Sequence, residues 1–270
     1  MDFAHMSLKE LRNWLGEMSW REIEGILPEL GQDPRQGVQS LIKSWRMRLN
    51  RREKEVAKWK NLCQRENQLK EKGFRHVAGI DEAGRGPLAG PVVAAAVILE
   101  IDKPLWGLDD SKRISPRQRE ELYRQITSSA IAWAVASSGP EYIDATNILQ
   151  ATRMAMSKAY NKLIVPPDYL LLDAIHLPCI KIPQEGIIGG DGKCACIAAA
   201  SVVAKVTRDR WMKKWDQQYP GYGFANHKGY PTPEHLKALT RLGPTPIHRL
   251  SFQPLADLCP TDENITSGGW

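Results

Sequence analysis

The stretch GIDEAGRGPLAGPVVAAAVIL, residues 79–99, places two neighbouring acids, Asp81 and Glu82, before a turn rich in glycine and proline. The apolar runs FRHVAGID (74–81) and GPVVAAAVIL (90–99) flank this turn and predict two adjacent strands of a sheet. Side chains that follow each other on a regular strand point to opposite faces. We therefore expect strand geometry to stop between Asp81 and Glu82, so that both carboxylates can serve one site.

Signals for strands and helices alternate in the rest of the chain after residue 73. Helices are predicted over 115–129, 144–163 and 196–215, and from Thr232–Pro233 to Gly243. Two further strands are predicted by AIAWAVASSG (130–139) and DYLLLDA (168–174). A short, continuous apolar run such as DYLLLDA is typical of a strand that is covered on both faces, as in a parallel sheet. The pattern predicts an α/β domain.

The first 72 residues predict a separate, all-helical region. Ser7 with Glu10 and Ser19 with Glu22 fit the capping box, and each pair precedes apolar residues at helical spacing. A third, long helix is predicted from Asp33–Pro34 to Gly73. We expect its tryptophans, and those before it, to pack rather than to stack on bases: Trp14, Trp20, Trp45 and Trp59.

The positive charge of the chain is concentrated in this long helix. The net charge of the 270 residues is +6, whereas residues 43–75 hold twelve Lys or Arg against four Glu. Such a segment can neutralise phosphates and bind nucleic acid without sequence preference. A solvated helix face is the alternative interpretation.

Composition narrows the class of protein and the kind of metal site. The five cysteines form no CxxC pair, which argues against a disulfide framework and against a structural zinc site. No apolar run approaches the ~20 residues of a membrane helix, and the first residues carry charges. We expect a cytoplasmic protein in which oxygen atoms hold any metal.

Four acids stand where the predicted layout offers a site: Asp81, Glu82, Asp173 at the end of a strand, and Asp191 in a glycine turn before a helix. Ligands of open α/β sheets bind beyond the carboxyl ends of strands. Carboxylates gathered there suit Mg²⁺ or Mn²⁺, and two such ions ~4 Å apart can direct phosphodiester hydrolysis. A capping or turn-forming role is the alternative for each acid alone, above all for Asp191.

Two further groups of residues could contact phosphate. The turn Gly84, Arg85, Gly86 fits neither G-x-G-x-x-G nor the P-loop, but its backbone N–H groups could approach a phosphate or a sugar hydroxyl. Ser201, Lys205 and Arg208 follow at i, i+4 and i+7 on the alanine-rich helix. A solvated face is the alternative for this row.

Six motifs taken together resemble bacterial ribonuclease HII. They lie in the order of that family over about residues 73–257, and the basic N-terminal region resembles the extension of some members from Gram-positive bacteria. The motifs are GIDEAGRGPLAGPVVAAAVIL, LDDSKRIS, LLLDA, GDGKCACIAAASVVAKVTRDR, YPGYGFANHKGYPTPEH and GPTPIHRLSFQPL.

The resemblance implies a fold, an activity and roles for residues. The fold is an RNase H-like five-stranded mixed sheet flanked by helices over residues 73–260. From the residues themselves we expect the basic helical extension over 1–72 to bind nucleic acid and the tail over 261–270 to be disordered. The activity is endonucleolytic cleavage of RNA in RNA/DNA hybrids, or 5′ to single ribonucleotides in duplex DNA, which leaves a 5′-phosphate and a 3′-hydroxyl. The four acids fall on the family's metal ligands. The substrate contacts would be Gly84, Arg85, Gly86, Lys112, Ser201, Lys205, Arg208 and Tyr230, whose ring stacks on a sugar beside the ribonucleotide.

Two positions depart from the family pattern, and two other functions stay open. Ala174 stands where members commonly have Gly, and the CAC segment (194–196) stands where they commonly have Ser. The alternatives are another RNase H-like nuclease of different specificity and a non-catalytic hybrid-binding module. We expect a monomer that uses two Mg²⁺ or Mn²⁺ ions.

Overall fold

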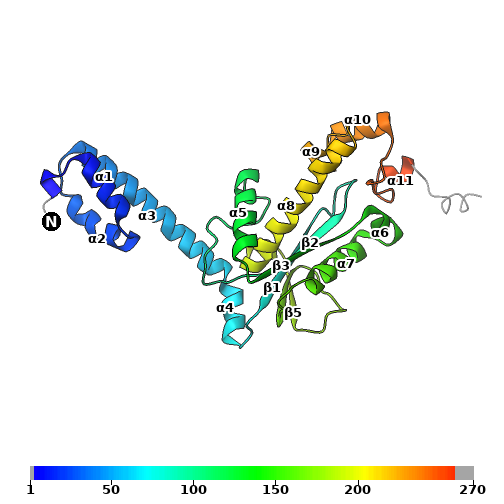
Figure 1. Cartoon of the computed structure of the whole chain (residues 1–270), viewed down its shortest axis with the longest axis horizontal. Coiled ribbons are helices and arrows are strands. Elements are labelled where there is room, and N and C mark those ends of the chain that lie inside the picture. The colour runs from blue at the N-terminus through cyan, green and yellow to red at the C-terminus, as the bar shows by residue number, and fades with distance from the viewer. Residues whose placement is uncertain (1–2, 259–270) are drawn as a thin grey trace, which may run out of the picture. The chain divides into compact units, whose positions relative to one another are not determined.

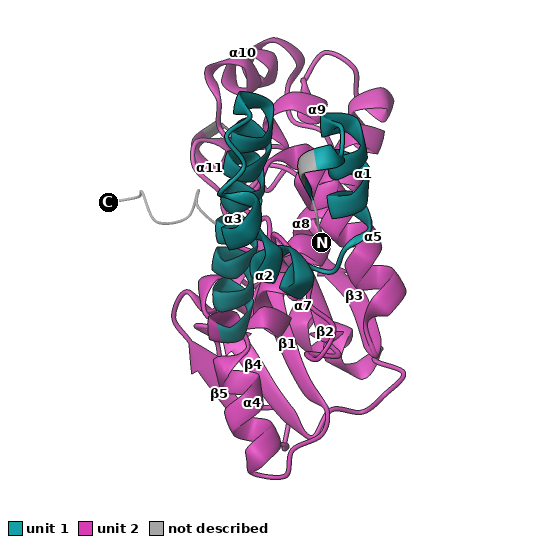
Figure 2. Ribbon diagram, turned by 90° about the vertical axis from the view of Figure 1, so that its left-hand side faces the viewer, with its two compact units in different colours: residues 1–60 teal, residues 61–270 magenta. Residues whose placement is uncertain are grey.

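The computed structural model describes residues 3–258, which form two compact units, Met1–Lys60 and Asn61–Trp270 (Figure 2). The tail expected over 261–270, and Cys259, lie outside the described residues. The four described cysteines are free thiols. None of the described helices is long and apolar enough to cross a membrane.

The first unit is helical, as predicted. It contains the 3₁₀ turn η1 (Phe3–His5), the helices α1 (Leu8–Glu17) and α2 (Trp20–Leu30), and most of α3 (Gln36–Leu62) (Figure 1). Ser7 and Ser19 form the two predicted capping boxes. Apolar side chains from all three helices pack into one small core, which includes Trp45. Trp20 packs edge-on against Trp45, so these aromatic rings serve packing, as the sequence indicated.

The basic segment is two helices rather than the one long helix that the sequence predicted. Helix α3 ends at Leu62, and α4 (Gln64–Glu71) begins after Cys63, which has φ −88° and ψ 5°. Glu66 and Leu69 of α4 are buried in the second unit, where the Glu66 carboxylate accepts a 2.9 Å hydrogen bond from the Cys196 amide. Because α4 packs on the second unit, the chain changes units before this helix.

The second unit is built on a mixed five-stranded sheet in the order β3-β2-β1-β4-β5. The strands β1 and β2 form an antiparallel pair, as do β2 and β3, whereas β4 runs parallel to both β1 and β5. The bounds are β1 Val77–Ala83, β2 Val92–Ile98, β3 Ala132–Ser138, β4 Tyr169–Asp173 and β5 Gln184–Ile187. This is the fold class that the family resemblance implied.

Helices cover both faces of the sheet (Figure 1). Helix α8 (Ala195–Gln218) packs on β1 and β2, and α7 (Ile148–Asn161) packs on β2 and β3. The predicted helix over 144–163 is divided in two, because Thr146 leaves helical geometry and Asn147 caps α7. The remaining helices are α5 (Pro116–Ser129), α6 (Pro140–Ala145), the 3₁₀ turn η2 (Gly190–Gly192), α9 (Phe224–His227), α10 (Pro233–Leu242) and α11 (Leu255–Leu258).

Candidate active site

The two neighbouring acids lie on one unbroken strand, so the expectation that strand geometry stops between them was wrong. Strand β1 pairs with β2 through Asp81, Glu82 and Ala83, and the chain turns only at Gly84, where φ is +95°. A Cβ on Gly79 would collide with the backbone of α8, so Gly79 and Asp81 share the face under α8. Glu82 therefore leaves the strand on the opposite face, yet its charge still acts on the Asp81 carboxylate.

Asp81 is a buried carboxylate in an unfavourable environment. Its side chain is 4% exposed, and it accepts a 2.7 Å hydrogen bond from the Glu82 amide. Burial, then the charge of Glu82, raises the pKa of Asp81 well above its usual range, and the charge of Asp173 adds to this. A hydrogen bond from Ser201 on α8 opposes the shift.

Glu82 is also short of partners. Its Oε1 forms an ion pair with Arg85 Nη1 at 3.3 Å, whereas its buried Oε2 has no hydrogen-bond partner. Burial raises the pKa of Glu82, Arg85 lowers it in part, and the charge of Asp173 raises it again. A buried acceptor that nothing satisfies costs free energy until a ligand reaches it.

Asp173 and Asp191 are brought to the same edge by neighbouring elements. Asp173 ends β4 and accepts a 2.8 Å hydrogen bond from the Gly190 amide, which holds the turn that carries Asp191. Burial, then the charge of Asp110, raises the pKa of Asp191, with a further contribution from Asp173. We call Asp81, Glu82, Asp173 and Asp191 the acid edge.

Asp110 is an acid that the sequence reading did not place in the site. It precedes Ser111 and Lys112 in the LDDSK motif, and its carboxylate accepts a 2.8 Å hydrogen bond from the Lys112 amide. Lys112 Nζ lies 3.7 Å from Asp191 Oδ2 on a side chain that is 80% exposed. Burial lowers the pKa of Lys112, but the charges of Asp191 and Asp110 raise it, and the net shift is upward. The motif itself was the signal, because it supplies an acid beside the predicted lysine.

The acid edge suits a hard divalent cation, although its side chains are not yet closed around one. No group of three His, Cys, Asp or Glu side chains between residues 3 and 258 is arranged to hold a metal ion already. Three of the four acids nevertheless have raised pKa values from burial and mutual repulsion, and Glu82 Oε2 lacks a partner. Oxygen donors in such a setting fit Mg²⁺ or Mn²⁺.

A hollow of about 260 Å³ adjoins the acid edge and gathers the predicted substrate residues. The ring of Tyr230 faces Gly86, because a Cβ built there would meet Tyr230 Cε1 at 3.6 Å. Tyr230 is half exposed, as a stacking role requires. The lining residues are Glu82, Ala83, Gly84, Arg85, Gly86, Ser111, Lys112, Ser201, Lys205, Arg208 and Tyr230.

The polar row on α8 serves three different purposes. Ser201 is buried and its hydroxyl shares a 2.9 Å hydrogen bond with the Ser111 hydroxyl, which ties α8 to the LDDSK motif. Lys205 Nζ donates to Asp209 Oδ1 at 2.7 Å and keeps partial exposure. Arg208 is 0% exposed, so in this structure it lies beneath the glycine turn rather than on an open phosphate-binding surface.

Arg208 and a residue that received no role from the sequence, Arg249, form what we call the arginine brace. Arg208 donates to the carbonyls of Pro91, Lys228 and Ala89 at 2.9–3.0 Å. Arg249 is likewise 0% exposed, and its donors also end on backbone carbonyls. Burial lowers the pKa to about 10 for Arg208 and about 9 for Arg249, so both remain charged at neutral pH. The motif GPTPIHRLSFQPL contains Arg249, but a residue that acts by holding backbone leaves no charge pattern to detect.

A chain of buried histidines supports the segment that carries Tyr230. His248 Nδ1 accepts from the Thr245 amide at 2.8 Å, so its Nε2–H donates to His235 Nε2 at 3.0 Å. His235 Nδ1 in turn donates to the Tyr230 carbonyl at 2.9 Å. Both rings must be neutral for this chain, and burial lowers the pKa of His248 to about 4 and lowers that of His235.

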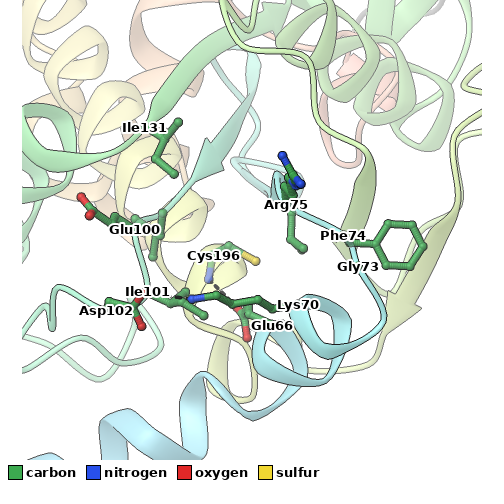
Figure 3. A pocket seen from close by; sticks show the side chains of 12 residues that line it. Glu66, Lys70, Gly73, Phe74, Arg75, Glu100, Ile101, Asp102, Ile131 and Cys196 are labelled. Atoms are coloured by element: carbon green, nitrogen blue, oxygen red, sulfur yellow. Dashed lines mark hydrogen bonds and ion pairs between the residues drawn. The ribbon is translucent and has the colours of Figure 1, made fainter.

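A second cavity, of about 450 Å³, lies at the start of β1 and contains none of the predicted site residues (Figure 3). Figure 3 shows Glu66 beside Cys196 among the lining residues, where α4 is attached to the first turn of α8. Lys70 and Asp102 pair at 3.0 Å on its wall. The cavity marks the attachment of α4, and the predicted site residues lie at the other end of the strand.

Solved ribonucleases H share this sheet and helix arrangement. The ribonuclease H2 of Pyrococcus horikoshii OT3 matches with a TM-score of 0.59 and 26% identity, over 68% of this chain and 97% of its own. Bst-RNase HIII in complex with Mn²⁺ matches with a TM-score of 0.50 over 67% of this chain and 68% of its own; at 14% identity it supports the fold alone. The protein is thus a nuclease of the ribonuclease H class.

The sequence comparisons define the class further. The family model for ribonuclease HII matches residues 78–255, and the model for the ribonuclease HII N-terminal domain matches residues 7–70. Ribonuclease HII of Geobacillus kaustophilus is 50% identical over 255 residues, which are 91% of this chain and 98% of that protein. This chain belongs to the ribonuclease HII family, and it is an endonuclease that acts on RNA/DNA hybrids.

Proposed function

We propose that this ribonuclease HII cleaves RNA in hybrids and also cuts 5′ to single ribonucleotides embedded in duplex DNA, leaving a 5′-phosphate and a 3′-hydroxyl. The observation that carries the proposal is the position of the acid edge, which adjoins the hollow formed by Gly84–Gly86 and Tyr230. The 2′-hydroxyl distinguishes RNA from DNA at a site, and this hollow offers backbone amides and an aromatic ring to a single nucleotide.

The acid edge would hold two divalent ions through Asp81, Glu82, Asp173 and Asp191. Bound there, the ions would supply an activated water and charge stabilisation at the phosphate. The exposed Lys112 approaches the substrate backbone while its ion pair keeps Asp191 in place. The oxygen donors of the acid edge fit Mg²⁺ or Mn²⁺ as the ions used here; Bst-RNase HIII, which shares the fold, was solved with Mn²⁺.

Arg208 fits a positioning role better than the direct phosphate contact that the sequence suggested, because its guanidinium donors are occupied by carbonyls. Arg85 and Lys205 keep exposed or partly exposed cations beside the hollow and are the better candidates for phosphate contact. Ser201 supports Asp81 from α8.

One assay tests the proposed reaction. A duplex with a single ribonucleotide, an RNA/DNA hybrid and an all-DNA duplex are incubated with Mg²⁺ or Mn²⁺, and the product ends are mapped. We expect cleavage of the first two and none of the third. Asp81→Asn should lower kcat/KM by roughly a thousand-fold or more, because electrostatic stabilisation supplies most of the rate. Near-normal cleavage by that variant would refute the assignment of the acids.

Binding without products would instead indicate a hybrid-binding module, and equal cleavage of the all-DNA duplex would indicate a nuclease of different specificity.

For the whole chain we propose a cytoplasmic monomer, in keeping with the finding that no described helix could cross a membrane.

We further propose that the first unit adds salt-dependent duplex affinity. The basic side chains of α3 that support this are exposed: Lys43, Arg46, Arg48, Arg51, Arg52 and Lys54. A deletion should end at Lys60, because a longer one would remove Glu66 and Leu69 from the core of the second unit.

Removal of residues 1–60 should weaken duplex binding and flatten the slope of log K against log salt, while kcat changes little. The matched control replaces Arg48 and Arg51 by glutamine and should flatten the slope by about 2 if both contact phosphates. Unchanged affinity in both proteins would favour a structural role for this unit.

A further inference from the structure

Arg249 forms hydrogen bonds to both ends of the glycine turn from the buried side. Its Nε donates to the Gly90 carbonyl at 2.9 Å, and Nη1 donates to the Arg85 carbonyl at 2.7 Å. Nη2 donates to the Gly84 carbonyl. One rigid, planar guanidinium thus fixes three carbonyls of a loop that has no regular secondary structure of its own.

These bonds determine where the amides of the turn point. In a planar trans peptide the C=O and the following N–H lie on opposite sides. When the carbonyls of Gly84 and Arg85 are directed at Arg249, the N–H groups of Arg85 and Gly86 are directed away from it. Within the described residues, neither of these two N–H groups has a hydrogen-bond acceptor. They remain as free donors beside the hollow at the acid edge.

We propose that Arg249 is the positioning residue for ribonucleotide recognition, because it presents the Arg85 and Gly86 amides to the ribose hydroxyl and the adjacent phosphate. The inference rests on the proposed function of this hollow and adds the residue that sets its geometry. Arg208 holds the second half of the loop through Ala89 and Pro91, so the two arginines divide the loop between them.

The segment that carries Arg249 is itself anchored to a distant helix. The Arg249 amide donates to the Leu88 carbonyl at 2.8 Å. Directly after it, the amides of Leu250 and Ser251 donate to the Asp144 carboxylate of α6 at 2.9 and 3.0 Å. Asp144 therefore holds the backbone directly after Arg249, and through it the position of that residue.

Arg249→Lys is the direct test, since lysine keeps the charge but cannot span three carbonyls. With the full-length protein, we expect kcat/KM for the single-ribonucleotide duplex to fall about a hundred-fold, as misplaced recognition groups do. The Kd for an all-DNA duplex should not change, because that duplex has no 2′-hydroxyl for the amides to contact. Added guanidinium chloride at a non-denaturing concentration should restore part of the activity of Arg249→Ala.

A second variant tests the role of Arg249 without replacing that residue, in case Arg249→Lys does not fold. Asp144→Asn should lower kcat/KM in the same direction but by less, again with an unchanged Kd for all-DNA duplex. The matched control is Asp257→Asn. Its carboxylate accepts a bond from Gln253 in the same terminal segment, so this variant should leave activity unchanged.

The outcomes separate the two proposals. Folded Arg249→Lys and Asp144→Asn proteins with wild-type kinetics would overturn the role of Arg249 alone. Equal losses of affinity for the ribonucleotide and all-DNA duplexes would also overturn it, because they would indicate general damage. A wild-type protein that fails to cleave the ribonucleotide duplex would overturn the proposed function first.

Discussion

The acid edge and the arginine brace meet at the same glycine turn, yet hydrogen bonds satisfy the charges of the brace and not those of the acid edge. The brace contains two fully buried cations, and every bond described above ends on a backbone carbonyl. The acid edge contains carboxylates with raised pKa values, and Glu82 Oε2 has no partner. A buried charge is tolerable when hydrogen bonds satisfy it and costly when they do not.

The difference separates the rigid part of the site from the part that awaits a ligand. The turn is held by donors that belong to the protein itself. The acid edge keeps unfavourable free energy that a cation can release on binding. Sites of this kind trade stability for function.

Breaking the brace at the turn should have a large effect on activity. A Cβ on Gly84 would lie 2.0 Å from Arg208 Nε, at φ +95°. Gly84→Ala should therefore displace the turn and lower kcat/KM about a hundred-fold, and cost about 1–3 kcal/mol of stability. The matched control is Gly73→Ala, which has a similar φ of +94° but open space around it. Equal losses of activity in the two variants would show that backbone strain, rather than contact with the brace, is responsible.

A smaller effect is expected from acid, through the histidine chain under Tyr230. The folded-state pKa of His248 is lowered to about 4, below the value of about 6.5 for an unfolded chain. Stability from this group is therefore present above pH 6.5 and is lost as the pH falls towards 4, by up to about 3 kcal/mol.

Urea unfolding of wild type and His248→Gln between pH 7 and pH 4.5 checks this sign. Glutamine does not titrate, so the variant should lose less stability than wild type across that window. His176→Gln, an exposed position, should follow the wild-type curve. Parallel curves for all three proteins would show that other groups cause the acid sensitivity.

Much of the fold could be predicted from the sequence, because capping residues and apolar runs mark where its helices and strands lie. The capping boxes of Ser7 and Ser19 and the apolar runs of β1, β2 and β4 each correspond to an observed element. Strand β5 was not read from the residues, since QEGI is short, half-buried and without alternation. It forms because β4 offers it a parallel partner.

The site shows the same division between local and tertiary information. The motifs identified the four acids and the glycine turn, and the fold brings them to one edge. Spacing could not show that Arg208 is buried. Nor could it show that Arg249 contacts the turn, because 159 to 165 positions of sequence separate Arg249 from the residues that it binds there. The structure explains the departure at Ala174 from the family pattern. This residue adopts φ +52°, a left-handed conformation that glycine adopts without steric cost.

One measurement tests most directly whether the acid edge is an unsatisfied cation site: thermal unfolding of wild type and Asp81→Asn, each with EDTA and with Mn²⁺. Removing a buried, repelled charge should make the metal-free variant more stable than metal-free wild type, on the order of 1 kcal/mol. Mn²⁺ should raise the Tm of wild type and raise that of Asp81→Asn far less. A metal-free variant that is less stable than wild type, with equal Mn²⁺ shifts in both proteins, would contradict this view of the site.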